Sequence, residues 1–223
     1  EELLKQRSAT LFGILNGVDY SEWNPADDPH IPKPFSADDL TGKAAAKAHL
    51  QEKVGLPVDE TVPLIGLVSR LAAQKGFYEL CDPHRGALQR MCREMSVQVV
   101  VLGTGEEWIE EELLVLQRQL PNIRVRTTFS DSLAHQIEAG ADLFLMPSRY
   151  EPCGLNQIYS LRYGTLPIVR ETVGLADTVE NYDSETGTGT GFMFRDLSPE
   201  SIFHTTEWAV SVWYEHPEHF RQM

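Results

Sequence analysis

The richest candidate site in the sequence is the run Glu151-Pro152-Cys153-Gly154-Leu155, which enters a stretch with helical periodicity. The backbone N–H groups of Gly154 and Leu155 could meet a phosphate at the start of that helix, while the Glu151 carboxylate accepts hydrogen bonds from neutral hydroxyls. A simpler interpretation is that Glu151 complements the positive end of the helix dipole and that Cys153 is a small buried side chain. The residues alone leave both interpretations of Glu151 open, and for Cys153 they favour the simpler one.

Two cations, Arg70 and Lys75, lie in the loop 69–76, between a predicted strand and a predicted helix. A guanidinium group and an ammonium group can together neutralise a diphosphate, and the start of a helix nearby adds oriented N–H donors. Two ordinary surface charges would give the same pattern. The spacing therefore indicates a phosphate site without excluding a solvated loop.

Weaker signals follow two other predicted strands. Gly103 and Gly105 form a bare G-x-G, for which we favour a tight turn before a helix, although close approach of a ligand is compatible with it. Phe129 could stack on a base, but the local pattern favours packing against Leu133 or Ile137 as a hydrophobic staple. His135, on the next predicted helix, is expected to be a structural histidine with satisfied hydrogen bonds.

The composition limits the class of partner. A chain of 223 residues, 42% of them hydrophobic, can bury one substantial core, so we expect a single domain over residues 1–223. A formal net charge of −14 argues against nucleic acid and anionic membrane as partners, and no apolar run is long enough to cross a bilayer. The cysteines at 81, 92 and 153 fit neither a disulfide framework nor a paired metal motif, which indicates a reducing compartment and argues against structural zinc.

Short β-branched apolar runs alternate with longer amphipathic runs, which predicts a doubly wound, Rossmann-like α/β fold with a parallel sheet. The predicted strands are 63–68, 97–102, 123–125, 143–146, 166–169 and 191–194. The predicted helices are 76–94, 106–119, 133–139, 154–163 and a last one from Ser198 toward Tyr214. In such a sheet, ligands bind beyond the carboxyl ends of the strands, where all four candidate segments lie.

The sequence before the first predicted strand does not show the alternation of short apolar and longer amphipathic runs. Residues 11–35 contain too many glycines and prolines for regular structure beyond a turn or a short strand, so we expect an extended N-terminal segment over residues 1–35. The capping residues 36–39 then predict the start of a helix that stops near Gly55.

Several motifs, taken in order, closely resemble those of bacterial glycogen synthases and plant starch synthases. They are Ser69-Arg70-Leu71 with Gln74-Lys75-Gly76, Ala139-Gly140-Ala141-Asp142, Met146-Pro147-Ser148-Arg149, Glu151 to Leu155, Leu161-Arg162-Tyr163-Gly164 and Gly174-Leu175-Ala176-Asp177-Thr178-Val179. The resemblance implies the GT-B architecture, in which two Rossmann-like domains face each other and the C-terminal one binds ADP-glucose. The chain, which starts at Glu1 rather than Met, resembles only that C-terminal domain. We therefore expect an N-terminal acceptor domain to be missing and the domain to be inactive alone.

The resemblance also implies roles for the residues of the two richest segments. Arg70 and Lys75 would grip the distal phosphate and stabilise the departing ADP, which is electrostatic catalysis of a leaving group. Glu151 would hold the 3- and 4-hydroxyls of the glucosyl group, and Gly154 and Leu155 would donate backbone hydrogen bonds to the phosphate.

The remaining donor-binding residues follow from the same resemblance. Phe129 stands where relatives place an aromatic ring against adenine, so the resemblance reverses the staple interpretation. Tyr159 stands at the second acid of the wider family's E-x7-E motif, as is usual in the synthase branch. Gly103, Gly105 and Cys153 complete the predicted donor-binding set.

The implied reaction transfers glucose from ADP-glucose to the non-reducing 4-hydroxyl of an α-1,4-glucan with retention of anomeric configuration. No metal ion or other cofactor is expected, because cationic side chains act at the diphosphate. We expect a cytoplasmic protein, or one of the plastid stroma if the chain is of plant origin. The alternatives are a related enzyme that uses UDP-glucose, such as a sucrose-type synthase, and a non-catalytic nucleotide- or glucan-binding module.

Overall fold

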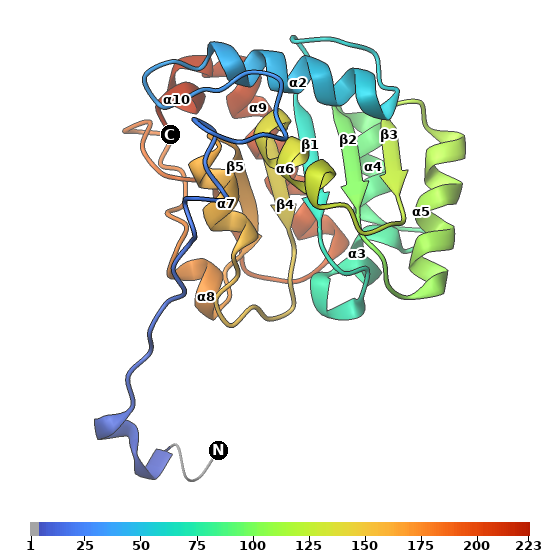
Figure 1. The fold of residues 1–223 in the computed structure, drawn as a ribbon. Coiled ribbons are helices and arrows are strands. Elements are labelled where there is room, and N and C mark those ends of the chain that lie inside the picture. The colour runs from blue at the N-terminus through green and yellow to red at the C-terminus, as the bar shows by residue number, and fades with distance from the viewer. Residues whose placement is uncertain (1–4) are drawn as a thin grey trace.

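The computed structural model describes residues 5–223 and is built on one six-stranded parallel sheet (Figure 1). The strands are β1 (Leu64–Val68), β2 (Gln98–Leu102), β3 (Ile123–Arg126), β4 (Leu143–Met146), β5 (Leu166–Arg170) and β6 (Phe192–Phe194). Their order in the sheet is β3-β2-β1-β4-β5-β6, and every neighbouring pair is parallel. This order confirms the predicted doubly wound, Rossmann-like fold.

Except for β3, where arginines alternate with apolar residues, the strands are nearly continuous apolar runs, as expected when helices cover both faces of a sheet. Alternate residues of one strand belong to different core clusters: Ile65 and Leu67 of β1 face one layer of helices, and Leu64 faces the other. One layer contains α3 (Phe77–Cys81), α4 (Ala87–Glu94), α5 (Glu107–Gln119) and α9 (Pro199–Glu215). The other contains α2 (Thr41–Val54), α6 (Asp131–Gly140) and α8 (Val173–Ala176).

The remaining elements are short: the 3₁₀ helices η1 (Ser8–Thr10) and η2 (Ala73–Lys75), α7 (Asn156–Arg162) and α10 (Pro217–Gln222). The last long helix starts as predicted, because the Ser198 hydroxyl accepts the Ser201 N–H at 3.1 Å and Pro199 follows it. Among the described residues, no helix is long and apolar enough to cross a membrane.

Two predicted helix boundaries were wrong, those of 76–94 and 154–163. The predicted helix 76–94 is two helices, since Pro83 and Gly86 interrupt it and the Asp82 carboxylate binds the N–H groups of His84 and Arg85 instead. The helix predicted after the capping residues 36–39 begins at Thr41, whose N–H donates to the Asp39 carboxylate at 3.0 Å. The helix expected from Gly154 begins at Asn156, after a glycine with φ of 75°.

The N-terminal segment lacks regular structure over residues 11–35, as predicted; its residues 1–4 lie outside the described part of the chain. Its later part packs on α6 and α7 and reaches the start of α2 (Figure 1). Trp23 lies between His135 and Tyr159, with ring centroids 3.8 Å and 4.0 Å away, and both pairs are stacked. The segment is therefore fastened to the domain by aromatic packing.

Candidate functional site

The candidate site lies where the strand order reverses, at the carboxyl ends of the adjacent strands β1 and β4. Loops that follow these two strands diverge to opposite sides, which leaves a crevice in doubly wound folds. Here the crevice has a volume of about 230 Å³. It is lined by Leu67, Val68, Ser69, Arg70, Lys75, Phe77, Leu145, Met146, Pro147, Ser148, Glu151, Gly154, Leu155 and Asn156.

An ion pair between Lys75 and Glu151 spans this cleft and joins the loop after β1 to the loop after β4. Both side chains are largely buried, at 18% and 11% exposure, so the pair is shielded from solvent. The Ser148 hydroxyl also approaches the Glu151 carboxylate, at 3.5 Å. A cation and a carboxylate are thus held together where a phosphorylated ligand would enter.

Gly76 brings the two loops close enough for that pair to form. Its φ is 80°, and a Cβ there would lie 2.1 Å from the Pro147 carbonyl oxygen, so no other residue fits without displacement. Beside it, the Arg149 N–H donates to the Gln74 carbonyl at 2.8 Å. Gly76 is therefore required for the contact between the loop after β1 and the loop after β4.

Arg70 lies on the exposed rim of the cleft. Its guanidinium donates to the Gln74 side-chain oxygen at 3.0 Å, which holds it on the same loop as Lys75. An exposed guanidinium that binds only a neutral amide is free to exchange that partner for an anion.

The opposite wall of the cleft is the turn at Gly154 and Leu155. Within residues 5–223, the backbone N–H groups of these two residues have no hydrogen-bond acceptor. The Asn156 side chain donates to the Val68 carbonyl at 2.7 Å and so ties this turn to the end of β1. Two free backbone donors therefore lie on a fixed turn, opposite Lys75.

Gly103 and Gly105 do not line the cleft. A Cβ at Gly103 would lie 1.9 Å from the Ser69 carbonyl oxygen, and one at Gly105 would lie 2.0 Å from that of Leu71. Both glycines therefore allow close packing of the loop after β2 against the loop that carries Arg70. Close contact between these two loops accounts for both glycines, and any effect on a bound ligand is indirect.

Glu106, just after these glycines, holds the same loop in place. Its carboxylate accepts the Ala73 N–H at 3.0 Å, the Tyr78 hydroxyl at 2.9 Å and the Trp108 indole N–H at 3.1 Å. These hydrogen bonds, that from Ala73 first, hold the pKa of Glu106 below its usual value. No local pattern indicates this role, because Ala73 and Tyr78 are about 30 residues away from Glu106.

Phe129 is 88% exposed, so the staple against Leu133 does not form and that local interpretation was wrong. The start of α6 is capped instead by Ser130, whose hydroxyl accepts the Leu133 N–H at 3.3 Å. An aromatic ring that makes so little contact is available for a flat ligand.

Tyr159 and Cys153 also lie outside the lining of the cleft. The Tyr159 ring is parallel to that of Trp23, with an angle of 3° between them, and fastens the N-terminal segment to α7. The Cys153 Sγ accepts the Asn16 N–H at 3.4 Å. Of the predicted residues, the structure brings Arg70, Lys75, Glu151, Gly154 and Leu155 together, and it gives Tyr159 a packing contact.

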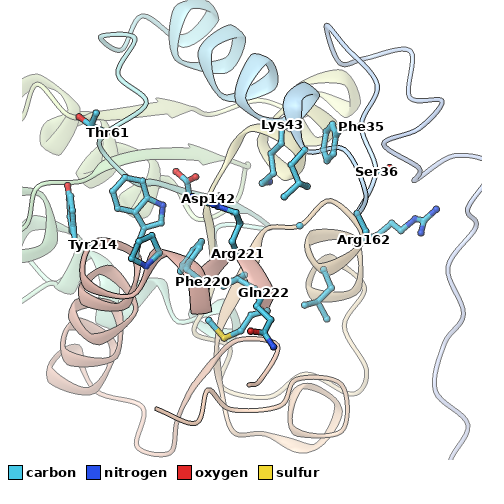
Figure 2. Close-up of a pocket in the computed structure, with 18 residues that line it drawn as sticks. Phe35, Ser36, Lys43, Thr61, Asp142, Arg162, Tyr214, Phe220, Arg221 and Gln222 are labelled. Atoms are coloured by element: carbon cyan, nitrogen blue, oxygen red, sulfur yellow. The ribbon is translucent and has the colours of Figure 1, made fainter. Parts of the chain in front are cut away.

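A second cavity, of about 770 Å³, lies at the opposite edge of the sheet, where Asp142 precedes β4 and Leu166 begins β5. Figure 2 shows side chains of α2, α9 and α10 around it, among them Lys43, Tyr214 and Arg221. This edge holds the amino ends of the strands, so the cavity is separate from the candidate site.

Lys43, in the wall of that second cavity, binds the ends of two helices. Its ammonium donates to the carbonyls of Ala139 at 3.2 Å, Ala141 at 3.0 Å and Tyr163 at 2.9 Å, and to the Thr165 hydroxyl at 2.8 Å. A cation is favourable at helix carboxyl ends, although burial lowers the pKa of Lys43 to about 8. Sequence reasoning missed this residue, because its partners are about 100 residues away.

The strand order and the charged cleft at its reversal define a doubly wound α/β domain suited to a phosphorylated ligand. Residues 50–222 match the family model of the group 1 glycosyl transferases. The chain belongs to this family. It is 53% identical over 221 residues to a glycogen synthase of Treponema denticola and 52% identical over 213 residues to one of Anaeromyxobacter dehalogenans.

These alignments cover 99% and 95% of this chain but only 45% and 43% of the two relatives, so the chain spans just under half of their length. Among solved structures, it is similar to the catalytic domain of starch synthase IV from Arabidopsis thaliana bound to ADP and acarbose. The TM-score is 0.89 at 33% identity, over 99% of this chain and 45% of that one. A sucrose-phosphate synthase from Thermosynechococcus elongatus shares the fold, with a TM-score of 0.58 at 19% identity over 78% of this chain and 43% of that one.

Proposed function

We propose that this chain is the donor-binding domain of a glycogen or starch synthase that transfers glucose from ADP-glucose to the 4-hydroxyl of an α-1,4-glucan with retention. The observation that carries the proposal is the Lys75–Glu151 pair in the cleft between β1 and β4. It places a group suited to phosphate beside a group suited to sugar hydroxyls. The similarity to curated glycogen synthases supports the same assignment.

In this proposal, Lys75 and Arg70 bind the diphosphate. The Lys75 ammonium exchanges the Glu151 carboxylate for a phosphate oxygen, and the Arg70 guanidinium exchanges the Gln74 amide. Negative charge grows on the diphosphate as the bond to glucose breaks, so two cations stabilise the transition state more than the bound donor. They supply the neutralisation that a metal ion would otherwise provide, and for that reason we expect no cofactor.

Glu151 is left free to accept hydrogen bonds from the glucosyl hydroxyls once Lys75 turns to the phosphate. Within residues 5–223 it is the one carboxylate that lines the cleft, which does not fit the two opposed carboxylates of glycosidases. We therefore assign Glu151 to sugar positioning rather than to nucleophilic attack. The free N–H groups of Gly154 and Leu155 would donate to a phosphate oxygen, and Phe129 would stack on adenine.

The acceptor glucan is proposed to bind a second, N-terminal domain, as the coverage of less than half of the relatives suggests. On this proposal the chain alone does not elongate glycogen. The three cysteines, none in a disulfide, support a reducing compartment such as the cytoplasm or the plastid stroma.

The proposal is tested by thermal shift and calorimetry with ADP, ADP-glucose, UDP and UDP-glucose, because a ligand that binds only the folded state raises the apparent Tm. We expect the adenosine compounds to raise the Tm more than the uridine compounds do. The Lys75→Met variant should lose most of this effect, whereas Lys33→Met, an exposed lysine of the N-terminal segment, should keep it.

Preferential binding of UDP-glucose would instead indicate a related enzyme with another donor. Binding of all four ligands unchanged in Lys75→Met would remove the cleft from the donor site. Incorporation of labelled glucose into glycogen by this chain alone would overturn the proposed need for a second domain.

A further inference from the structure

We infer that the N-terminal segment and the first turns of α6 form a binding site for a divalent transition-metal ion such as zinc, with His30, Asp131 and His135 as ligands. Each of these side chains offers one ligand atom, and the three atoms lie within 4.8 Å of one another. None of the three residues lines the cleft between β1 and β4, so this inference stands apart from the proposed donor site.

The strongest observation is the His135 side chain, which is 1% exposed and has one nitrogen without a partner. Its Nδ1 lies 2.8 Å from the Asp28 carboxylate, whereas its Nε2 is buried with no hydrogen-bond partner. A carboxylate can only accept, so a neutral His135 carries its proton on Nδ1 and exposes a lone pair on Nε2. Asp28 therefore leaves Nε2 as the His135 nitrogen that can bind a metal ion, in the cluster that includes His30 and Asp131.

Asp28 supports His135 in the way that metal sites commonly support their histidines. Metal-binding imidazoles usually donate their second nitrogen to a carboxylate, which sets the tautomer and the orientation of the ring. Asp28 is itself held by the Tyr163 hydroxyl at 2.6 Å and the His30 N–H at 2.8 Å. Trp23, stacked 3.8 Å from the His135 ring, fixes the plane of that ring further.

The two other ligands come from positions that the fold holds nearby. Asp131 and His135 are four residues apart on α6 and so share one face of the helix. The His30 ring is 4.8 Å from the His135 ring, and the His30 carbonyl accepts the Gln136 amide at 2.8 Å. The site thus joins two segments about 100 residues apart in the sequence.

The donor set favours zinc, cobalt or nickel over magnesium or calcium, because two imidazole nitrogens and one carboxylate suit borderline metals and the latter two prefer oxygen. Tetrahedral zinc with bonds of about 2.0–2.1 Å places its ligand atoms roughly 3.4 Å apart. The exposed Asp131 and the half-buried His30 therefore need to close by about an ångström, and water can fill the fourth position.

The absence of a paired cysteine motif argues against a zinc site built from cysteines. It does not argue against a zinc site built from imidazole and carboxylate groups, which also bind zinc. A bound ion would link the N-terminal segment to the start of α6, two residues after Phe129. Its role would be to fasten that segment, while the cations of the cleft act on the diphosphate.

The inference is tested by calorimetric titration of the metal-free chain with zinc chloride, and with magnesium chloride for comparison. We expect one zinc ion per chain and no magnesium binding. His30→Ala and Asp131→Asn should each weaken zinc binding about tenfold or more. His216→Ala is the matched control, because His216 and His219 also stack their rings, 5.4 Å apart, on the surface.

The ligands are identified by cobalt substitution, which gives visible absorption bands that are intense in tetrahedral sites. We expect these bands in the wild-type chain and in His216→Ala, but not in His30→Ala, with no thiolate-to-cobalt charge-transfer band. Zinc should also raise the Tm of the wild type and not that of His30→Ala. A chain that binds no zinc, binding that His30→Ala and Asp131→Asn leave unchanged, or a thiolate band would each overturn the inference.

Discussion

In the Glu151→Gln variant, the side chain keeps its size and can still accept a hydrogen bond from Lys75, but it loses its negative charge. In the wild type the Glu151 carboxylate is paired with the Lys75 ammonium, which the proposed diphosphate also needs to bind. The negative charge of Glu151 in the cleft also repels the diphosphate. We therefore expect Glu151→Gln to bind ADP more tightly than the wild type, although the variant should be poorer at holding glucose.

The size of the expected change in ADP affinity follows from the burial of the Lys75–Glu151 ion pair. Hydrogen bonds to charged groups contribute about 1.5–3 kcal/mol, and removal of the charge from one partner roughly halves that value. Because both side chains are largely buried, at 18% and 11% exposure, solvent screening discounts the interaction only in part. The cost of displacing residue 151 should fall by about 1 kcal/mol, which corresponds to roughly fivefold tighter ADP binding.

Calorimetric titration of ADP into both chains measures this difference directly. Glu79→Gln is the matched control, because Glu79 forms an ion pair with Arg149 at a similar exposure of 12% but does not line the cleft. Its ADP affinity should stay within about twofold of the wild type. Weaker or equal ADP binding by Glu151→Gln would refute the reasoning that Glu151 and the diphosphate compete for Lys75.

Three further predictions concern residues around the two cavities. Lys43→Met removes one donor from each of three helix-end carbonyls and should lower the free energy of unfolding in urea by about 2–3 kcal/mol; a loss below roughly 0.5 kcal/mol would deny Lys43 that role. Gly76→Ala, with φ of 80° and the Pro147 oxygen 2.1 Å from the new Cβ, should cost about 2 kcal/mol or more by the same measurement. Phe129→Ala should leave the Tm unchanged, because the ring is exposed, yet weaken ADP binding roughly fivefold through the loss of stacking; unchanged ADP affinity would exclude Phe129 from the base site.

Local patterns were enough to predict the sheet and the centre of the candidate site. Buried parallel strands are short apolar runs, so the sequence marks them directly, and the residues that follow β1 and β4 must meet at one edge. Lys75 and Glu151 could therefore be placed in one cleft without coordinates, although their ion pair could not be foreseen. Gly76 belongs to the Gln74-Lys75-Gly76 motif, and only the position of Pro147 in the structure explains why a glycine is needed there.

Contacts between distant segments needed the tertiary structure. Tyr159 occupies a motif position that predicts donor binding, but Trp23 of the N-terminal segment stacks on its ring. Phe129 was expected from its neighbours to pack on Leu133, yet Ser130 caps the helix and the ring stays exposed. Local pattern cannot decide such cases, because the competing partner is either far away in the sequence or absent.

By itself, the sequence determined the positions of the strands, the order in which the candidate site residues follow them, and the family resemblance. Hydrophobic period and motif spacing are local properties, so they can be seen without a structure. Only the tertiary structure decided which of the predicted side chains reach the cleft. It also joined His30 to Asp131 and His135, and it left the His135 Nε2 buried and unpaired. Such groupings depend on how a segment without regular structure packs on two helices, and no periodicity in the sequence encodes that packing.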